Sequence, residues 1–348
     1  MNILKPLNFV RTRIMERLTK NVGKSYSNTK IDLKHKVDIK KILISRPNHK
    51  LGNQLLLTPL IQELIITFPD CKIDLFVKGG VAYPVFENYE QIDKIIQLPR
   101  KPFNHLINYG MCWFSIRSKR YDLVINGDKN SSSGRLSTKF AKAPFKIFGE
   151  VDEEIQQIHT DYEHISKYPI YNLRYYLTKL SFKENNKKVP TLNIKLSDSE
   201  IEKGREILNN LVKNNNKTIC IYTNATNDKC YSEDCWETLY SRLLKEYSNY
   251  NIIEMLPVEN ISKISFKAPN FYSKDIHEMG AIINNTSVFI AADNGIMHLA
   301  SASLTPTVGF FKVTNQNIYE PYGNGSLALN TNDSSIDDWI RAINTILK

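Results

Sequence analysis

The sequence predicts an α/β protein with two Rossmann-like domains that face a cleft. Short apolar runs rich in β-forming residues alternate with longer segments of helical periodicity. This alternation favours parallel sheets joined by right-handed crossovers. The strands we expect lie at 41–45, 72–77, 94–98, 121–125 and 145–148 in the first half, and at 218–222, 251–255, 287–292 and 306–311 in the second half.

The length of 348 residues exceeds one ordinary hydrophobic core and indicates two domains. The segment 181–195 is polar and interrupted by proline, so it is the best candidate for a linker. We therefore expect a basic extension over 1–36, one domain over 37–185 and a second over 186–348. A cleft between two such domains is a usual place for a ligand.

The helices we expect share an amphipathic pattern. In the first half, Gln54–Phe68 reads as one helix that follows a polar loop over 46–53. In the second half the expected helices lie at 198–213, 233–247, 275–284, 296–303 and 337–348.

The net charge of +10 is concentrated near the N-terminus, where residues 1–41 hold eleven Lys or Arg and three acidic residues. Apolar residues recur among these charges at near-helical spacing. Such a basic amphipathic helix is typical of a membrane-surface element that binds anionic lipid. The alternative is a helix packed on the protein's own surface. Nucleic acid is not an expected partner, because no binding motif appears and the basic residues are not interleaved with aromatic ones.

The five cysteines are scattered and form no CxxC pair. This pattern favours reduced thiols and no zinc site. No apolar run approaches the roughly 20 residues of a membrane helix, and the start does not read as a secretory signal. We therefore expect a cytoplasmic protein that needs neither metal nor cofactor.

The most informative stretch is the junction at Asp293-Asn294-Gly295. An apolar strand ends there and an alanine-rich helical pattern follows at once. Asp or Asn at this position can cap the first backbone N–H groups of the helix. The remaining N–H groups point outward with the positive end of the helix dipole. The junction is therefore a predicted seat for a diphosphate.

A second candidate is the loop from Arg46 to Asn53, between the first strand and the first helix. Open α/β sheets bind ligands at this position. The loop contains one glycine, Gly52, so the GxGxxG fingerprint of dinucleotide-binding domains is absent. A nicotinamide-dependent dehydrogenase is therefore disfavoured.

Together these motifs resemble the lipopolysaccharide heptosyltransferases, glycosyltransferase family nine. The pattern Asp-x-Gly-x-x-His-Leu-Ala at 293–300 is similar to the nucleotide-sugar site of that family. The resemblance covers 40–77 and 219–323, and its other matches are Arg46, Gly52, Thr58-Pro59-Leu60, Phe68-Pro69, Lys229, Tyr231 and Trp236. It implies the GT-B fold and an inverting, metal-independent transfer of a sugar. The implied donor is ADP-heptose and the implied acceptor is a lipopolysaccharide core on a lipid anchor.

The resemblance also implies roles for individual residues. On the donor side, Lys229 would neutralise the leaving diphosphate. The other residues expected to bind the donor are Thr223, Thr226, Glu259, Asp293, Asn294, Gly295 and His298. The N-terminal half would hold the acceptor, with Arg46, His49 and Lys50 suited to its anionic groups. Ordinary alternatives stand beside some of these roles: Glu259 as an exposed loop residue, His298 as a packed structural histidine, and Trp236 as core.

Asn53 stands where the family has an aspartate that is its proposed general base. An amide cannot accept a proton at neutral pH. Another group could supply the base, and His49 is the nearest titratable candidate. Alternatively, Asn53 only orients the acceptor hydroxyl, or the protein binds without catalysing. Asn53 could also cap the following helix.

The leading interpretation is therefore an enzyme, a cytoplasmic glycosyltransferase held peripherally on the inner face of the cytoplasmic membrane. The alternatives are a transferase of the same fold with another nucleotide-sugar donor, and a non-catalytic protein that binds nucleotide sugars.

Overall fold

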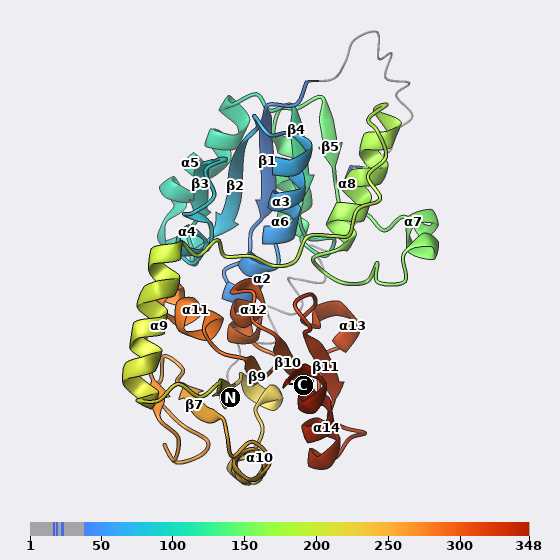
Figure 1. Cartoon of the computed structure of the whole chain (residues 1–348). Coiled ribbons are helices and arrows are strands. Elements are labelled where there is room, and N and C mark those ends of the chain that lie inside the picture. Colours follow the sequence, from blue (N-terminus) through green and yellow to red (C-terminus); the bar gives the residue numbers. More distant parts are fainter. Residues whose placement is uncertain (1–16, 18, 20–21, 24–37, 348) are drawn as a thin grey trace. The chain divides into compact units, whose positions relative to one another are not determined.

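The computed structural model describes residues 17, 19, 22–23 and 38–347 (Figure 1). The predicted basic extension over 1–36 therefore lies almost wholly outside the described residues and stays a prediction. The chain divides into two compact units. The first comprises residues up to His49, Pro59–Tyr83 and Tyr89–Pro190, and the second comprises Lys50–Thr58, Pro84–Asn88 and Thr191–Lys348. Two short segments from the first half of the sequence thus pack with the second unit.

The first unit is built on a five-stranded parallel sheet in the order β3-β2-β1-β4-β5. The strands are β1 (Lys41–Arg46), β2 (Lys72–Lys78), β3 (Ile92–Leu98), β4 (Leu123–Asn126) and β5 (Phe145–Ile147). From β1 the chain adds β2 and β3 on one side and then returns to add β4 and β5 on the other. The order therefore reverses between β1 and β4, where the carboxyl end of β1 carries Arg46.

Helices flank this sheet (Figure 1). They are α3 (Thr58–Thr67), α5 (Leu106–Ser118), α6 (Ser132–Phe140), α7 (Glu153–Ile158) and α8 (Tyr168–Lys179), with a 3-10 turn at Pro102–Asn104. The residues of α4 (Ala82–Phe86) are divided between the two units. Ile116 of α5 is fully buried against Leu43, Phe76 and Val124. One side of α5 therefore closes one face of the sheet.

The second unit contains a six-stranded parallel sheet in the order β11-β10-β9-β6-β7-β8. Its strands are β6 (Thr218–Tyr222), β7 (Asn251–Met255), β8 (Asn270–Phe271), β9 (Val288–Ala292), β10 (Thr307–Phe311) and β11 (Leu327–Asn330). Its helices are α2 (Leu51–Leu55), α9 (Asp198–Val212), α10 (Glu233–Glu246), α11 (Ile276–Asn284), α12 (Gly295–Ala302), α13 (Gln316–Tyr319) and α14 (Ile336–Leu347), with a 3-10 turn at Asn227–Lys229. Two parallel sheets with helices confirm the predicted fold class. Trp236 is buried against Phe310, as its reading as a core residue requires.

The prediction of one helix over Gln54–Phe68 is wrong. Two helices, α2 and α3, replace it, and α2 begins inside the segment predicted to be a loop. Pro59 explains the break, because proline has no N–H to donate to the carbonyl of residue 55. The hydroxyl of Thr58 donates to the Leu55 carbonyl instead, at 2.7 Å. The break lets α2 pack with the second unit while α3 stays in the first.

Two features join α9 and α11 closely. A Cβ on Gly204 of α9 would lie 2.4 Å from the carbonyl carbon of Ala281 in α11, so only glycine permits this packing. Beside it, the buried ring of His277 bonds Glu200 through Nδ1 at 2.7 Å and the carbonyl of Pro84 through Nε2 at 2.6 Å. Because Glu87 Oε1 is also 3.1 Å from Nε2, His277 fastens segment 84–88 to the two helices.

No helix among the described residues is both long enough and apolar enough to cross a membrane.

Glu200 makes this junction sensitive to acid. Burial opposes its charge, but hydrogen bonds from Ser197 together with the charge and hydrogen bond of His277 outweigh burial, and they hold the pKa of Glu200 below its ordinary value. A carboxyl group whose pKa is lower in the folded state stabilises the fold above its unfolded pKa, and loses that contribution as pH falls through the folded pKa. Replacing Glu200 with Gln should therefore cost about 1 kcal/mol at about pH 6 and almost nothing at about pH 3.

Urea unfolding at several pH values would measure this difference. The matched control is Glu206→Gln on the same helix, where the side chain is exposed and little change is expected at any pH. An effect of Glu200→Gln that does not vary with pH would contradict the assigned role.

Candidate functional site

The strand order of the second unit locates a ligand site before any side chain is considered. From β6 the chain proceeds to β7 and β8 on one side and then crosses to β9 on the other. Ligands of open α/β sheets bind at the carboxyl ends of the two strands where the order reverses. Those ends are the loop after β6, which leads to Lys229, and the turn after β9 at Asp293.

Lys229 and Asp293 meet at this edge as an ion pair. Asp293 is buried directly after β9, whereas Lys229 ends the 3-10 turn and is partly exposed. An ammonium group has three N–H donors, so pairing with one carboxylate leaves donors for an anionic ligand. The buried carboxylate therefore fixes a cation at the mouth of the site.

Asn294 is the N-cap of α12. Its side-chain oxygen accepts from the N–H groups of Ile296 at 2.7 Å and Met297 at 2.9 Å, and its Nδ2 donates to the Asn224 carbonyl at 3.0 Å. Asn294 therefore already uses two of the N–H groups at this helix N-terminus, and fewer of them remain for an anion than the sequence suggested. Asn294 instead links the β9 turn to the β6 loop.

Gly295 and Gly52 let α2 approach α12. A Cβ on Gly52 would lie 2.8 Å from Cδ2 of His298 and 3.3 Å from the Cα of Gly295. A Cβ on Gly295 would lie 3.3 Å from the Gly52 nitrogen. Gly295 packs against α2 on the side where a side chain would lie, and its contact with a phosphate stays a prediction. His298 is a buried residue, as its structural interpretation requires, and its Nε2 lies 4.0 Å from Asp293 Oδ1.

Asn53 lies inside α2, one residue after this contact. The suggestion that it caps the following helix is wrong, because α2 begins at Leu51 and Lys50 is its N-cap residue. Asn53 is half-buried. The structure thus brings the site of the missing aspartate into the same compact unit as Asp293 and His298.

The predicted acceptor residues differ in burial. Arg46 is buried at the end of β1, and its Nη1 donates to the Gly127 carbonyl at 3.3 Å, which ties the reversal point of the first sheet together. His49 and Lys50 are exposed. Arg46 and His49 belong to the first unit and Lys50 to the second. Their roles toward an acceptor stay predictions.

Thr223 belongs to a buried network that the sequence analysis missed. Its hydroxyl donates to Glu254 Oε1 at 2.6 Å and accepts from the N–H of Lys263 at 3.1 Å. Ser262 donates to the other oxygen of Glu254 at 2.6 Å. Burial raises the pKa of Glu254, and these bonds oppose that shift. The sequence did contain a sign of this network, a glutamate within the apolar strand 252–255. Thr223 therefore shapes the loop, and contact with a donor stays a prediction.

Lys312 is a further residue that sequence reasoning missed. It follows β10 at the same sheet edge, its Nζ donates to the Cys230 carbonyl at 2.9 Å, and it lies 4.7 Å from the centre of the Tyr231 ring. The sequence did contain a sign of this residue, a lysine directly after the apolar pair Phe310-Phe311 at the end of a predicted strand. Thr226 and Glu259 are exposed. They lie in the loops after β6 and β7, as the predicted strand positions require.

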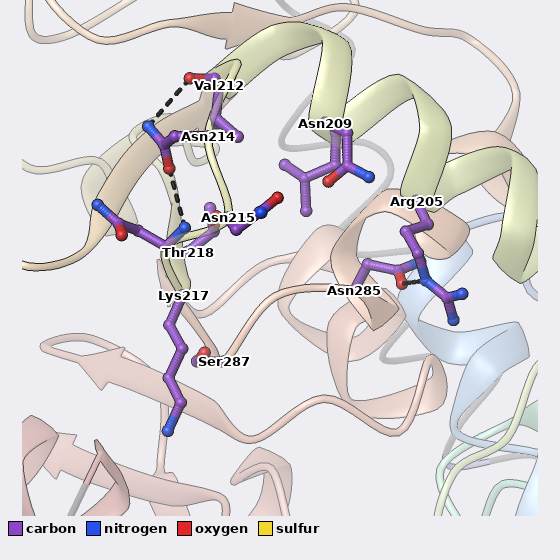
Figure 2. Close-up of a pocket in the computed structure, with 11 residues that line it drawn as sticks. Arg205, Asn209, Val212, Asn214, Asn215, Lys217, Thr218, Asn285 and Ser287 are labelled. Atoms are coloured by element: carbon purple, nitrogen blue, oxygen red, sulfur yellow. Dashed lines mark hydrogen bonds between the residues drawn. The ribbon is translucent and has the colours of Figure 1, made fainter.

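The described residues contain no group of three or more His, Cys, Asp or Glu that could hold a metal ion. A surface pocket of about 370 Å³ lies at the opposite edge of the second sheet, near the amino ends of β6 and β9 (Figure 2). Asn209 and Lys217 line it. Arg205, also in its lining, is bonded to Glu202 and Asn285. This pocket is separate from the edge that carries Lys229 and Asp293.

Known proteins share a family model and a fold with this chain. Residues 111–336 match the family model for glycosyltransferase family 9 (heptosyltransferase). The chain is similar to a family 9 glycosyltransferase from Veillonella parvula, with 17% identity, coverage of 90% of this chain and 98% of that one, and a TM-score of 0.70. Two Escherichia coli structures, ADP-heptose lipopolysaccharide heptosyltransferase II and heptosyltransferase WaaC with ADP, are each 14% identical with TM-scores of 0.61. They cover 89% and 88% of this chain, and 98% and 99% of their own length. No curated protein matches the chain. At these identities the structural likeness establishes the fold, which is the GT-B arrangement.

The contact between Gly52 and His298 can be tested by mutation. Because His298 is buried, a methyl group at Gly52 has to displace the ring or the whole of α2. We expect Gly52→Ala to destabilise the protein by about 1–3 kcal/mol, which exceeds the gain in helix propensity of about 1 kcal/mol.

Gly110→Ala is the control, since Gly110 is also helical and nothing lies within 4 Å of its added Cβ. That variant should gain about 0.5–1 kcal/mol. Thermal unfolding of both variants measures the difference. Equal stabilisation of the two would show that α2 does not pack on α12 as described.

Proposed function

This chain belongs to glycosyltransferase family 9, and from that membership we propose that it transfers heptose from ADP-heptose to a lipopolysaccharide core acceptor. It is a glycosyltransferase by family, and the proposal concerns its donor, its acceptor and its mechanism. The observation that carries the proposal is the Lys229–Asp293 pair at the point where the strand order of the second sheet reverses. A cation fixed there suits the diphosphate of a nucleotide sugar.

The donor class has support from neighbouring structures. Escherichia coli heptosyltransferase WaaC was solved with ADP and with ADP-2-deoxy-2-fluoro heptose. Both compounds present a diphosphate, the group that the ammonium of Lys229 suits. Asn294 would hold the two loops in register around it through its bond to Asn224.

The proposed transfer is a single displacement with inversion and without a metal ion. The acceptor hydroxyl oxygen attacks the anomeric carbon while the bond from that carbon to the diphosphate oxygen breaks. The electron pair leaves with ADP, whose growing negative charge Lys229 stabilises. The proton of the hydroxyl passes to a base. Asn53 cannot accept it, so Asn53 orients the hydroxyl while His49 remains the candidate base.

The acceptor would reside at a membrane surface. We place the enzyme in the cytoplasm, peripherally on the inner face of the cytoplasmic membrane, with the basic segment 1–36 as one attachment to anionic lipid. Arg46, His49 and Lys50 would face anionic groups of the acceptor.

The donor assignment is tested by binding. A panel of ADP- and UDP-sugars is screened by thermal shift, and ADP-heptose should stabilise the protein most. Lys229→Ala should weaken ADP binding by about tenfold to a hundredfold, because a charge-assisted hydrogen bond contributes about 1.5–3 kcal/mol. Lys229→Arg should retain part of the affinity.

The control is Lys267→Ala, whose ammonium pairs with Glu237 and which should bind ADP as the parent does. Melting temperatures without ligand separate lost binding from lost folding, since Lys229→Ala leaves the buried Asp293 without its cation. Unchanged ADP affinity in Lys229→Ala would overturn the assignment of the diphosphate site.

The role of Asn53 is tested by the rate of transfer. Asn53→Ala should lower kcat/KM for transfer by about tenfold or more while ADP affinity is unchanged. Asn53→Asp should add an ionisation near about pH 4 to the pH profile, where an ordinary carboxyl group titrates. If neither variant alters transfer, Asn53 does not orient the acceptor. If the parent neither transfers nor hydrolyses any donor that it binds, the protein is a nucleotide-sugar-binding relative of the enzymes.

A further inference from the structure

Helix α5 of the first unit exposes an apolar stripe. Ile107, Met111 and Phe114 follow one another at helical spacings of four and three residues, and 83%, 60% and 64% of their respective surfaces are exposed. The opposite side of the helix packs on the core, since Ile116 is buried there and Trp113 packs beside it. A soluble protein rarely leaves such a contiguous apolar stripe bare without a partner for it.

Two neighbours widen this stripe. Leu106 is exposed at the start of α5, and Phe140 is exposed at the end of α6. The ring of Phe140 lies 5.8 Å from that of Trp113, and the guanidinium of Arg117 lies 5.5 Å above the Phe140 ring. We call this surface the α5 face, and it consists of Leu106, Ile107, Met111, Phe114 and Phe140.

The border of the α5 face is basic. Residues 99–121 and 129–149, which include α5 and α6, contain ten Lys or Arg and no Asp or Glu. Lys119 is neutralised by Asp74 and Asp93. Several others are exposed, and a bridge between the backbones of residues 120 and 142 sets two of them side by side. Arg117, Arg120, Lys139 and Lys142 are exposed basic residues of these segments.

We propose that the α5 face docks this protein onto an anionic lipid surface. The apolar stripe would enter the boundary between head groups and acyl chains, while the basic border meets anionic head groups. With 13 residues, α5 is about 20 Å long, too short to cross a bilayer, so it would lie in the plane of the surface.

Charge decides against the other occupants. A second copy of the chain would bring one basic border against another. The chain's own N-terminal segment is also basic, with eleven Lys or Arg and three acidic residues over 1–41. A second copy and the N-terminal segment would therefore each bring positive charge against the basic border of the α5 face. This repulsion between like charges costs free energy. An anionic bilayer offers the opposite charge.

This proposal rests on the proposed function in one respect. The lipid-anchored acceptor is the reason why the enzyme would dock onto a membrane. The docking assay itself contains neither donor nor acceptor. A failure of the docking surface is therefore distinguishable from a failure of the sugar-transfer assignment.

The test is flotation of the full-length protein with vesicles made of equal parts phosphatidylcholine and phosphatidylglycerol. The double variant Ile107→Ser, Phe114→Ser should bind at least about tenfold more weakly than the parent. The matched control is Ile66→Ser, Ile158→Ser, which removes two apolar side chains of the same unit that are 58% and 71% exposed. The control should bind as the parent does. Residues 1–36 are unchanged in every variant, so the difference belongs to the α5 face.

Charge is tested separately. Vesicles of phosphatidylcholine alone should bind the parent at least about tenfold more weakly, and raising salt from about 0.1 M to about 0.5 M should also weaken binding. The double variant Arg120→Glu, Lys142→Glu should reproduce that loss on the anionic vesicles. Melting temperatures and ADP binding of all variants should match those of the parent, which shows that they are folded.

Two results would overturn the proposal. The first is binding of the Ile107→Ser, Phe114→Ser variant as tight as that of the parent. The second is a parent protein that is dimeric in solution and becomes monomeric in that variant, because the α5 face would then be an interface between copies.

Discussion

The close approach of Gly52 to α12 is the contact on which the site depends. It exists because neither Gly52 nor Gly295 has a side chain, so the backbone of α2 reaches the first turn of α12 and the ring of His298. Pro59 makes the approach possible, since it separates α2 from α3 and lets α2 leave the first unit. Asn53 follows Gly52 in α2 and therefore lies close to the start of α12.

The electrostatics of the site follow from the burial of Asp293. A carboxylate removed from water needs a partner, and the loop after β6 supplies Lys229. Asn294 links the same two loops by a neutral hydrogen bond to Asn224. Glu254 accepts from Thr223 and Ser262 and so connects β7 with the loop after β6. The loops that follow the central strands are therefore fixed to one another by polar groups before any ligand binds, which favours a preorganised site.

The two units use their surfaces differently. In the second unit, polar residues follow the carboxyl ends of the parallel strands, and the pocket at the amino ends is a separate feature. In the first unit, α5 covers the sheet with one side and leaves an apolar stripe with a basic border on the other. An enzyme whose acceptor is anchored in lipid would gain from such a surface, because it reduces the search for the acceptor to two dimensions.

The sequence by itself determined the fold class, the positions of most strands, the end of the first strand at Arg46 and the junction at 293–295, since hydrophobic periodicity and turn residues are local signals. It also placed Lys229 and Asp293 at strand ends, and in a parallel sheet those ends share one edge. Only the tertiary structure decided that Asn294 bonds the Asn224 carbonyl, that Gly52 and Gly295 let α2 pack on α12, and that Glu254 accepts from Thr223. These facts depend on which backbone approaches which, and residues as far apart as 52 and 295 carry no local sign of their contact.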